Sequence, residues 1–225
     1  MSAPEIARPK EQPISYAWRL HPLMRSIALV VQEVAVTPLV ALFYRVRVTG
    51  RERLRHLDGP VLFAPNHCLH WDNGIILTAM PVSWRWRLAI AAGGETIFGN
   101  RFRGVLAASL GGAFPIARDG GVRRAIRALR AELERGFSVL IYPEGKLTVN
   151  GPMQPFKPGT GLLAALSGTP VVPMRVKVRH HSLVDRIGWP LRGDVEVAFG
   201  EPLWFAHDSD PRDVTRSIEA AVAAL

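Results

Sequence analysis

The stretch of the sequence richest in reactive side chains is APNHCLHWDNG, residues 64–74. It follows the apolar run PVLFAP and places His67, Cys68, His70 and Asp72 within six positions. Three kinds of site use such residues: a histidine base oriented by a carboxylate, a metal site and a cysteine nucleophile. The spacing has to decide which of the three fits best.

A histidine base is the interpretation that the spacing favours. If a helix begins near Asp72, its carboxylate can hold the far ring nitrogen of His67 while the near nitrogen takes a proton from a hydroxyl group. The stretch contains no serine beside this pair. Such a pair would therefore deprotonate a substrate rather than a nucleophile of the protein.

The alternatives use the same residues differently. His67, His70 and Asp72 could be metal ligands, although the other histidines of the chain follow no recognisable metal-binding spacing. Cys68 could be a nucleophile, but as the next residue after His67 it is expected to point away from that base. A purely structural alternative is that the histidines cap the following helix.

The elements that must position these residues alternate along the chain. Apolar positions recur every three or four residues over 119–135, with arginines between them, which predicts an amphipathic helix that Gly136 ends. Further helices are predicted at 158–167 and from about Arg212. Strands buried on both faces that alternate with helices indicate an α/β fold with a mostly parallel central sheet flanked by helices. The predicted strands are residues 61–65, 87–92, 113–117, 138–142, 171–178 and 195–199.

The N-terminal region is different in character. Residues 1–13 are polar and proline-rich and are predicted to be a disordered lead. Residues 14–50 are predicted to be an apolar helical segment that associates with a membrane as an in-plane or re-entrant helix pair, and the alternative is a buried helix of the soluble core. Glu33 and Pro38 disfavour a clean transmembrane span. Arg19 and Arg25 are expected in the layer of lipid headgroups. Residues 51–225 then form the α/β domain.

Composition limits the setting and the partners. The single cysteine excludes an internal disulfide and favours a reducing, cytoplasmic compartment. The net charge of +9 attracts anions, which include nucleic acid, an anionic membrane surface and acidic small molecules or carrier proteins. The charge by itself does not choose among them.

Several motifs at predicted strand ends resemble one known family. NHCLHWD resembles the N-H-x4-D signature of the glycerolipid acyltransferases, whose best-known members acylate lysophosphatidic acid. Stretches similar to the later blocks of that family follow in the same order and span about residues 61–176 with the first. These stretches are GGAFPIAR (111–118), LIYPEGKLT (140–148), FKPGTGLLA (156–164) and PVVPMRV (170–176).

The resemblance implies a reaction and a set of site residues. His67 would be the general base and Asp72 would orient it, while the acceptor alkoxide attacks an acyl thioester directly. Acyl-CoA or acyl-carrier protein would be the donor, with no cofactor and no metal. Glu144 could instead be a structural carboxylate that holds an arginine or a loop. The implied substrate-binding residues are Asn66, Arg118, Glu144, Gly145, Lys146 and Lys157.

The same resemblance implies a setting in phospholipid biosynthesis. The partners would be a lysophospholipid acceptor, the acyl donor and an anionic membrane surface, and the protein would be peripheral or monotopic on the cytoplasmic face of the membrane. Where the family usually has T-R-S after P-E-G, however, this chain has Lys146, Leu147 and Thr148. An acceptor without phosphate, such as a lyso-aminolipid or glycolipid, is therefore an alternative.

Two other classes of function are compatible with parts of the sequence. A metal-dependent hydrolase would use His67, His70 and Asp72. A nucleic-acid-binding protein would use the arginine-rich helix at 123–135, but the chain has no known nucleic-acid motif, and that role leaves its apolar N-terminal segment unexplained. We therefore expect no nucleic-acid partner.

Overall fold

A seven-stranded sheet forms the centre of the computed structural model, which describes residues 16–94, 97–116, 121–149, 151–180 and 192–225. The strand order is β1-β7-β6-β2-β5-β3-β4, and every neighbouring pair is parallel except the antiparallel pair β6 and β7. The strands are β1 (Tyr44–Thr49), β2 (Leu62–Pro65), β3 (Leu88–Gly93), β4 (Phe114–Ile116), β5 (Ser138–Leu140), β6 (Val171–His180) and β7 (Gly193–Phe199).

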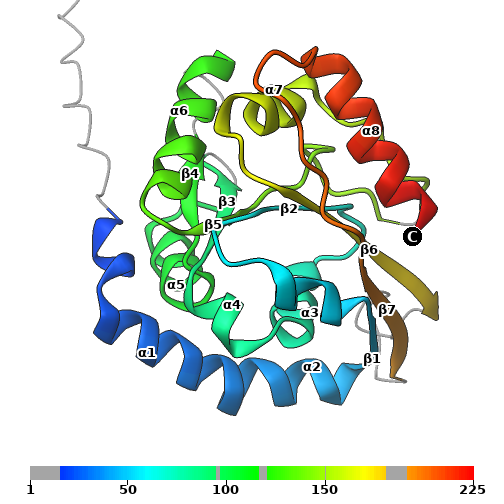
Figure 1. Ribbon diagram of the computed structural model, residues 1–225. Helices are drawn as coiled ribbons and strands as arrows, with labels where there is room; N and C mark the ends of the chain where they lie inside the picture. The colour runs from blue at the N-terminus through cyan, green and yellow to red at the C-terminus, as the bar shows by residue number, and fades with distance from the viewer. Residues whose placement is uncertain (1–15, 95–96, 117–120, 150, 181–191) are drawn as a thin grey trace, which may run out of the picture.

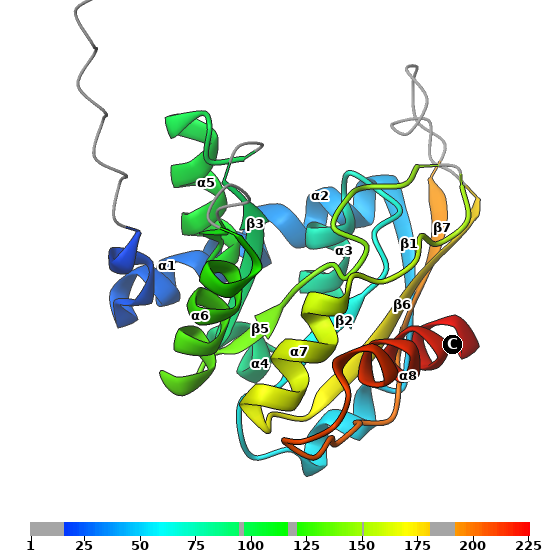
Figure 2. The same ribbon diagram turned by 90° about the horizontal axis from the view of Figure 1, so that it is seen from above.

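Helices cover both faces of this sheet (Figure 1). Helices α6, α7 and α8 lie on one face, and α3, α4 and α5 lie on the other, with α1 and α2 in a further layer outside them. Figure 2 shows α1 and α8 on opposite sides of the molecule. The helices are α1 (Pro22–Val31), α2 (Thr37–Phe43), α3 (Asp72–Ala79), α4 (Val82–Trp86), α5 (Arg101–Gly111), α6 (Gly121–Glu134), α7 (Pro158–Ser167) and α8 (Pro211–Ala224), with shorter turns at Ala17–Leu20, Gln32–Val36 and Arg51–His56.

This architecture confirms the predicted fold class. All six predicted strands are present, and the helices predicted at 158–167, at the C-terminus and across 119–135 are observed as α7, α8 and α6. The predictions did not identify α4 and α5.

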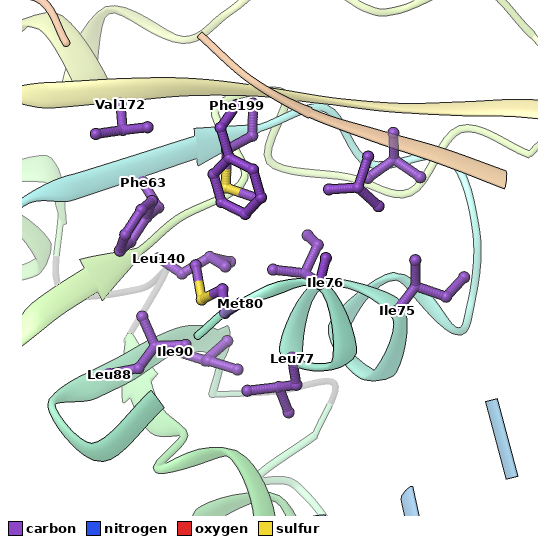
Figure 3. Close-up of a cluster of buried hydrophobic side chains, with 14 of the residues drawn as sticks. Phe63, Ile75, Ile76, Leu77, Met80, Leu88, Ile90, Leu140, Val172 and Phe199 are labelled. Carbon is purple, nitrogen blue, oxygen red and sulfur yellow. The ribbon is translucent and has the colours of Figure 1, made fainter. Parts of the chain in front are cut away.

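Two apolar clusters hold the layers together. Figure 3 shows the cluster between the sheet and α3, where Phe63 and Leu140 from the strands meet Ile76 from the helix and Met80, the residue that follows it. The second cluster joins the other face to α6, α7 and α8. Each residue of β2 is buried, because this central strand has helices on both faces, and this explains why its sequence is apolar without alternation.

The N-terminal apolar segment forms one helical stretch from Pro22 to Phe43, long and apolar enough to cross a membrane by length and composition alone. Only 17% of its most apolar window is buried against the rest of the protein. The prediction of a helical segment up to residue 50 is wrong at its end, because Tyr44–Thr49 form strand β1 of the sheet. These residues pair with β7, and this long-range contact cannot be predicted from the local sequence pattern.

The expectation that Arg19 and Arg25 lie among lipid headgroups is also wrong. Their exposed fractions are 4% and 5%. Arg19 pairs with the buried Glu132 at 2.6 Å, and Arg25 donates hydrogen bonds to the backbone carbonyls of Arg85, Trp86 and Leu88. Burial lowers the pKa of Arg25 to about 10, so it stays charged at neutral pH. These two arginines attach the N-terminal segment to the body of the protein.

Candidate active site

The turn between β2 and α3 brings His67 and Asp72 together. Asp72 is the first residue of α3, and its Oδ2 lies 2.8 Å from Nδ1 of His67. The carboxylate of Asp72 is buried, whereas 23% of the His67 side chain is exposed. Because Nδ1 is engaged by Asp72, Nε2 is the nitrogen left to accept a proton from a substrate.

Asp72 is held in place by the backbone of the same turn. Its Oδ2 also accepts hydrogen bonds from the amides of Cys68 at 2.8 Å and Leu69 at 2.9 Å. Charge-assisted bonds of this kind are stronger than neutral ones and fix a carboxylate in one orientation. Six residues of local sequence therefore contain both the histidine and the carboxylate that orients its ring.

Tyr142, which follows β5, fixes the plane of the His67 ring. The two rings stack with their centroids 4.0 Å apart and an angle of 20° between their planes. The hydroxyl of Tyr142 donates to Oδ1 of Asn73 at 2.7 Å, which ties it to the first turn of α3. Neither residue is predicted from the sequence, because nothing in the local pattern shows that the end of β5 lies beside His67.

Glu144 connects the two loops of the site. It is buried, and its two carboxylate oxygens accept hydrogen bonds from the amides of His67 at 2.7 Å and Gln154 at 2.8 Å. The amide of Thr148 in turn donates to the carbonyl of His67 at 2.9 Å. Glu144 thus has the supporting geometry that was the alternative to a direct substrate contact.

Asn66 makes a similar connection to strand β6. Its side-chain amide donates to the carbonyl of Val176 at 3.0 Å, and its side-chain oxygen accepts from the amide of Val176 at 2.7 Å. The side chain therefore continues the pairing of β2 with β6 beyond Pro65, where the strand itself ends. In this position Asn66 locates His67 relative to β6.

Cys68 lies beside His67 in sequence but is poorly suited to be a nucleophile. Its Sγ lies 3.5 Å from the carbonyl of Val176 and 3.8 Å from Oδ1 of Asp72. Burial, together with the negative charges of Asp72 and Glu144, raises the pKa of its thiol well above 9.0. At neutral pH the thiol is therefore protonated, and the thiolate is the reactive form.

The site opens into a cleft of about 640 Å³. His67 and Asn66 line one side, and the loop around Thr148 and Met153 lines another. Alternate residues of β6, Arg175, Lys177 and Arg179, add three cations to the lining. A larger cleft of about 930 Å³ lies near the amino ends of β2, β3 and β5, and none of the predicted site residues lines it.

The other predicted contacts lie around the P-E-G turn rather than in the cleft lining. Gly145 has a φ of 69°, a conformation that favours glycine. A Cβ atom at this position would lie 2.5 Å from the ammonium of Lys157, so the Lys157 side chain packs against the glycine. Lys146 and Lys157 are exposed. Arg118 lies outside the described residues.

The metal alternative finds no ligand set among the residues that the structure describes. His70 is exposed, and Oδ2 of Asp72 already forms hydrogen bonds with Nδ1 of His67 and with two backbone amides. In the described ranges, no three histidine, cysteine, aspartate or glutamate side chains lie close enough together to hold a metal ion.

Comparisons with known proteins identify the family and a similar fold. The chain is 29% identical over 166 residues to "1-acyl-sn-glycerol-3-phosphate acyltransferase BAT2, chloroplastic" of Brassica napus, covering 72% of this chain but only 46% of that protein. Its fold is similar to that of the 1-acyl-sn-glycerophosphate (LPA) acyltransferase PlsC from Thermotoga maritima, with a TM-score of 0.62, 22% identity and coverage of 89% and 81% of the two chains. The sequence model of the acyltransferase family matches residues 45–177, which include all of β1 but its first residue, the His67–Asp72 turn and the P-E-G turn. The chain therefore belongs to the acyltransferase family.

Proposed function

We propose that this acyltransferase moves a fatty acyl group from a thioester to a hydroxyl group of a lysophospholipid, with lysophosphatidic acid as the preferred acceptor. The observation that carries this proposal is the His67–Asp72 pair, 2.8 Å apart, at the wall of an open cleft. The activity named for the Brassica napus relative supports the acceptor, and the cations of the cleft suit an anionic lipid.

The reaction follows from the position of the base. Nε2 of His67 accepts the proton of the acceptor hydroxyl as its oxygen attacks the carbonyl carbon of the thioester. The new C–O bond forms, the C–S bond breaks, and the departing thiolate takes the proton back from the imidazolium. Asp72 stabilises the imidazolium in between, and no acyl-enzyme is needed.

The setting that we propose is the cytoplasmic face of a membrane, with the α1–α2 stretch lying in its surface. Exposed apolar side chains run along this stretch, and the most exposed is Val34 at 70%. Within the stretch the acidic Glu33 is paired with Arg85 of the body, which lowers the cost of placing it near lipid. The exposed apolar side chains on α1, α2 and the turn between them are Leu23, Ile27, Val30, Val34, Leu39 and Leu42.

An acceptor panel tests the reaction. The purified protein is supplied with one radiolabelled acyl-CoA, or the matching acyl-carrier protein, and with lysophosphatidate, lysophospholipids, a lyso-aminolipid, a glycolipid or glycerol 3-phosphate. We expect the highest kcat/KM with lysophosphatidate. Transfer to the lyso-aminolipid or glycolipid alone would favour the acceptor without phosphate, and transfer to none of them would contradict the proposal.

A further inference from the structure

Strand β6 extends the active-site cleft beyond the family motifs. Strand β2 ends at Pro65, whereas β6 continues to His180, so the residues of β6 after Val176 lie past the end of their neighbour. The segment between β5 and α7 reaches across to this part of β6 (Figure 2), and the cleft lies between them. Arg175, Lys177 and Arg179 line the same cleft as His67.

We propose that Arg175, Lys177 and Arg179 bind a phosphate monoester of the substrate and make the enzyme selective for phosphorylated ligands. Two substrates of the proposed reaction can carry such a group: a lysophosphatidate acceptor and the 3′-phosphate of a coenzyme A donor. The proposal rests on the proposed function, and it assigns the phosphate site to strand β6.

The charge balance of the cleft supports an anionic ligand. Glu144 is the one acidic residue in its lining, as far as the described residues show, and both of its carboxylate oxygens are occupied by backbone amides. The lining therefore carries three cations and one carboxylate that is already satisfied, while Arg179 also pairs with Glu196 outside the lining. A cleft lined by one sign of charge concentrates ligands of the opposite sign.

The three cations are held in position but retain unused donors. Arg175 donates from Nη1 to the carbonyl of Val222 at 3.1 Å, while its buried Nε has no partner in the described part of the chain. Lys177 donates to the backbone oxygen of Leu225, and Arg179 donates from Nη2 to Glu196 at 2.7 Å. Since a guanidinium has five N–H donors and an ammonium has three, each side chain can still donate to a phosphate.

The P-E-G turn is a weaker candidate for this role. Leu147 stands where the related motif has an arginine, so the turn lacks that bidentate donor. Lys146 is exposed, and neither it nor Lys157 belongs to the lining of the cleft. The cations that do line it come from β6.

The test compares Lys177→Gln, Arg179→Gln and the double variant with the wild type. Arg216→Gln is the matched control, because Arg216 is also an exposed, ion-paired arginine but lies on α8 outside the cleft lining. One arm varies the acceptor, lysophosphatidate against monoacylglycerol, and the other varies the donor, acyl-CoA against acyl-3′-dephospho-CoA. The double variant should raise KM about 10- to 100-fold for the phosphorylated member of one pair, with kcat nearly unchanged.

The arm that responds identifies the source of the phosphate. An increase for lysophosphatidate alone assigns the site to the acceptor, and an increase for acyl-CoA alone assigns it to the donor. The proposal would be overturned if the double variant changed KM no more than Arg216→Gln does. It would also be overturned if the double variant changed KM equally for the phosphorylated and the non-phosphorylated member of each pair.

A binding measurement keeps this test separate from the proposed function. Inorganic phosphate, at constant ionic strength with chloride, should raise the Tm of the wild type, and the double variant should need at least about tenfold more phosphate for the same shift. This result does not depend on acyl transfer. Suppose that the wild type acylates no acceptor, but phosphate raises its Tm and does not raise the Tm of the double variant. The proposed function is then wrong, while the anion site is supported. Equal shifts in both proteins would overturn the site.

Discussion

The orientation of one histidine ring is the feature on which the site depends at the scale of single residues. Asp72 fixes its Nδ1, and Tyr142 fixes the plane of the ring. A base held in one orientation loses little further freedom when the substrate binds, which is one source of catalytic rate.

We predict that His67→Ala lowers the rate of acyl transfer about 10²- to 10⁴-fold, the usual cost of losing a general base. Asp72→Asn should also reduce the rate strongly, because an amide cannot stabilise the imidazolium. The measurement is acceptor-dependent release of free thiol from acyl-CoA by the purified variants.

His70→Ala is the control for this experiment, because His70 lies three residues away and is exposed. It should retain nearly full activity, also after treatment with EDTA. A loss as large as that of His67→Ala, in protein with an unchanged melting temperature, would return the metal site to consideration.

Cys68 gives a second prediction at this scale. Because burial and the nearby carboxylates raise the pKa of its thiol, iodoacetamide at pH 8 should label the native protein at least about tenfold more slowly than the unfolded protein. Cys68→Ala should keep most of the activity. Equal labelling rates, or an inactive but well-folded Cys68→Ala variant, would contradict a passive role for the thiol.

At the scale of elements, the α1–α2 stretch has two different sides. Arg25, Gln32 and Val40 are buried against the body, so removing the whole stretch would also remove part of the packing. Val30 and Val34 are 60% and 70% exposed, so they can be changed without loss of packing.

We predict that the double variant Val30→Glu, Val34→Glu weakens binding to anionic vesicles about tenfold or more, because it replaces apolar surface with two charges. Flotation of the purified protein with liposomes measures this binding. Trp204→Glu is the control, since Trp204 is 65% exposed but lies after β7, away from this stretch. Equal flotation of the double variant and the control would show that these side chains do not contact the bilayer.

For the whole molecule, two protonated groups at the site link stability to pH. Folding raises the pKa of Cys68 above 9.0 and that of Tyr142 above 10.0, mainly by burial. As pH rises past these values, the unfolded chain releases both protons while the folded chain keeps them. The unfolded state then binds fewer protons, so the free energy of unfolding falls.

We predict that this free energy decreases between pH 8.5 and 10.5 with a slope that approaches about 1.4 kcal/mol per pH unit for each group. Urea unfolding at several pH values measures the slope. It should be smaller in Cys68→Ala, Tyr142→Phe than in the wild type. The same slope in both proteins would mean that other groups govern alkaline unfolding.

The sequence by itself determined what depends on neighbours along the chain. His67 and Asp72 meet because only four residues lie between them at a turn into a helix, and the strands and the amphipathic helix α6 follow from short-range apolar patterns. Residues brought together from distant segments could not be found in this way. Tyr142 under His67, Val176 beside Asn66, β1 in the sheet and the cations of β6 in the cleft all depend on the order of the strands. Strand order is decided by packing and pairing across the whole molecule, and no local pattern encodes it.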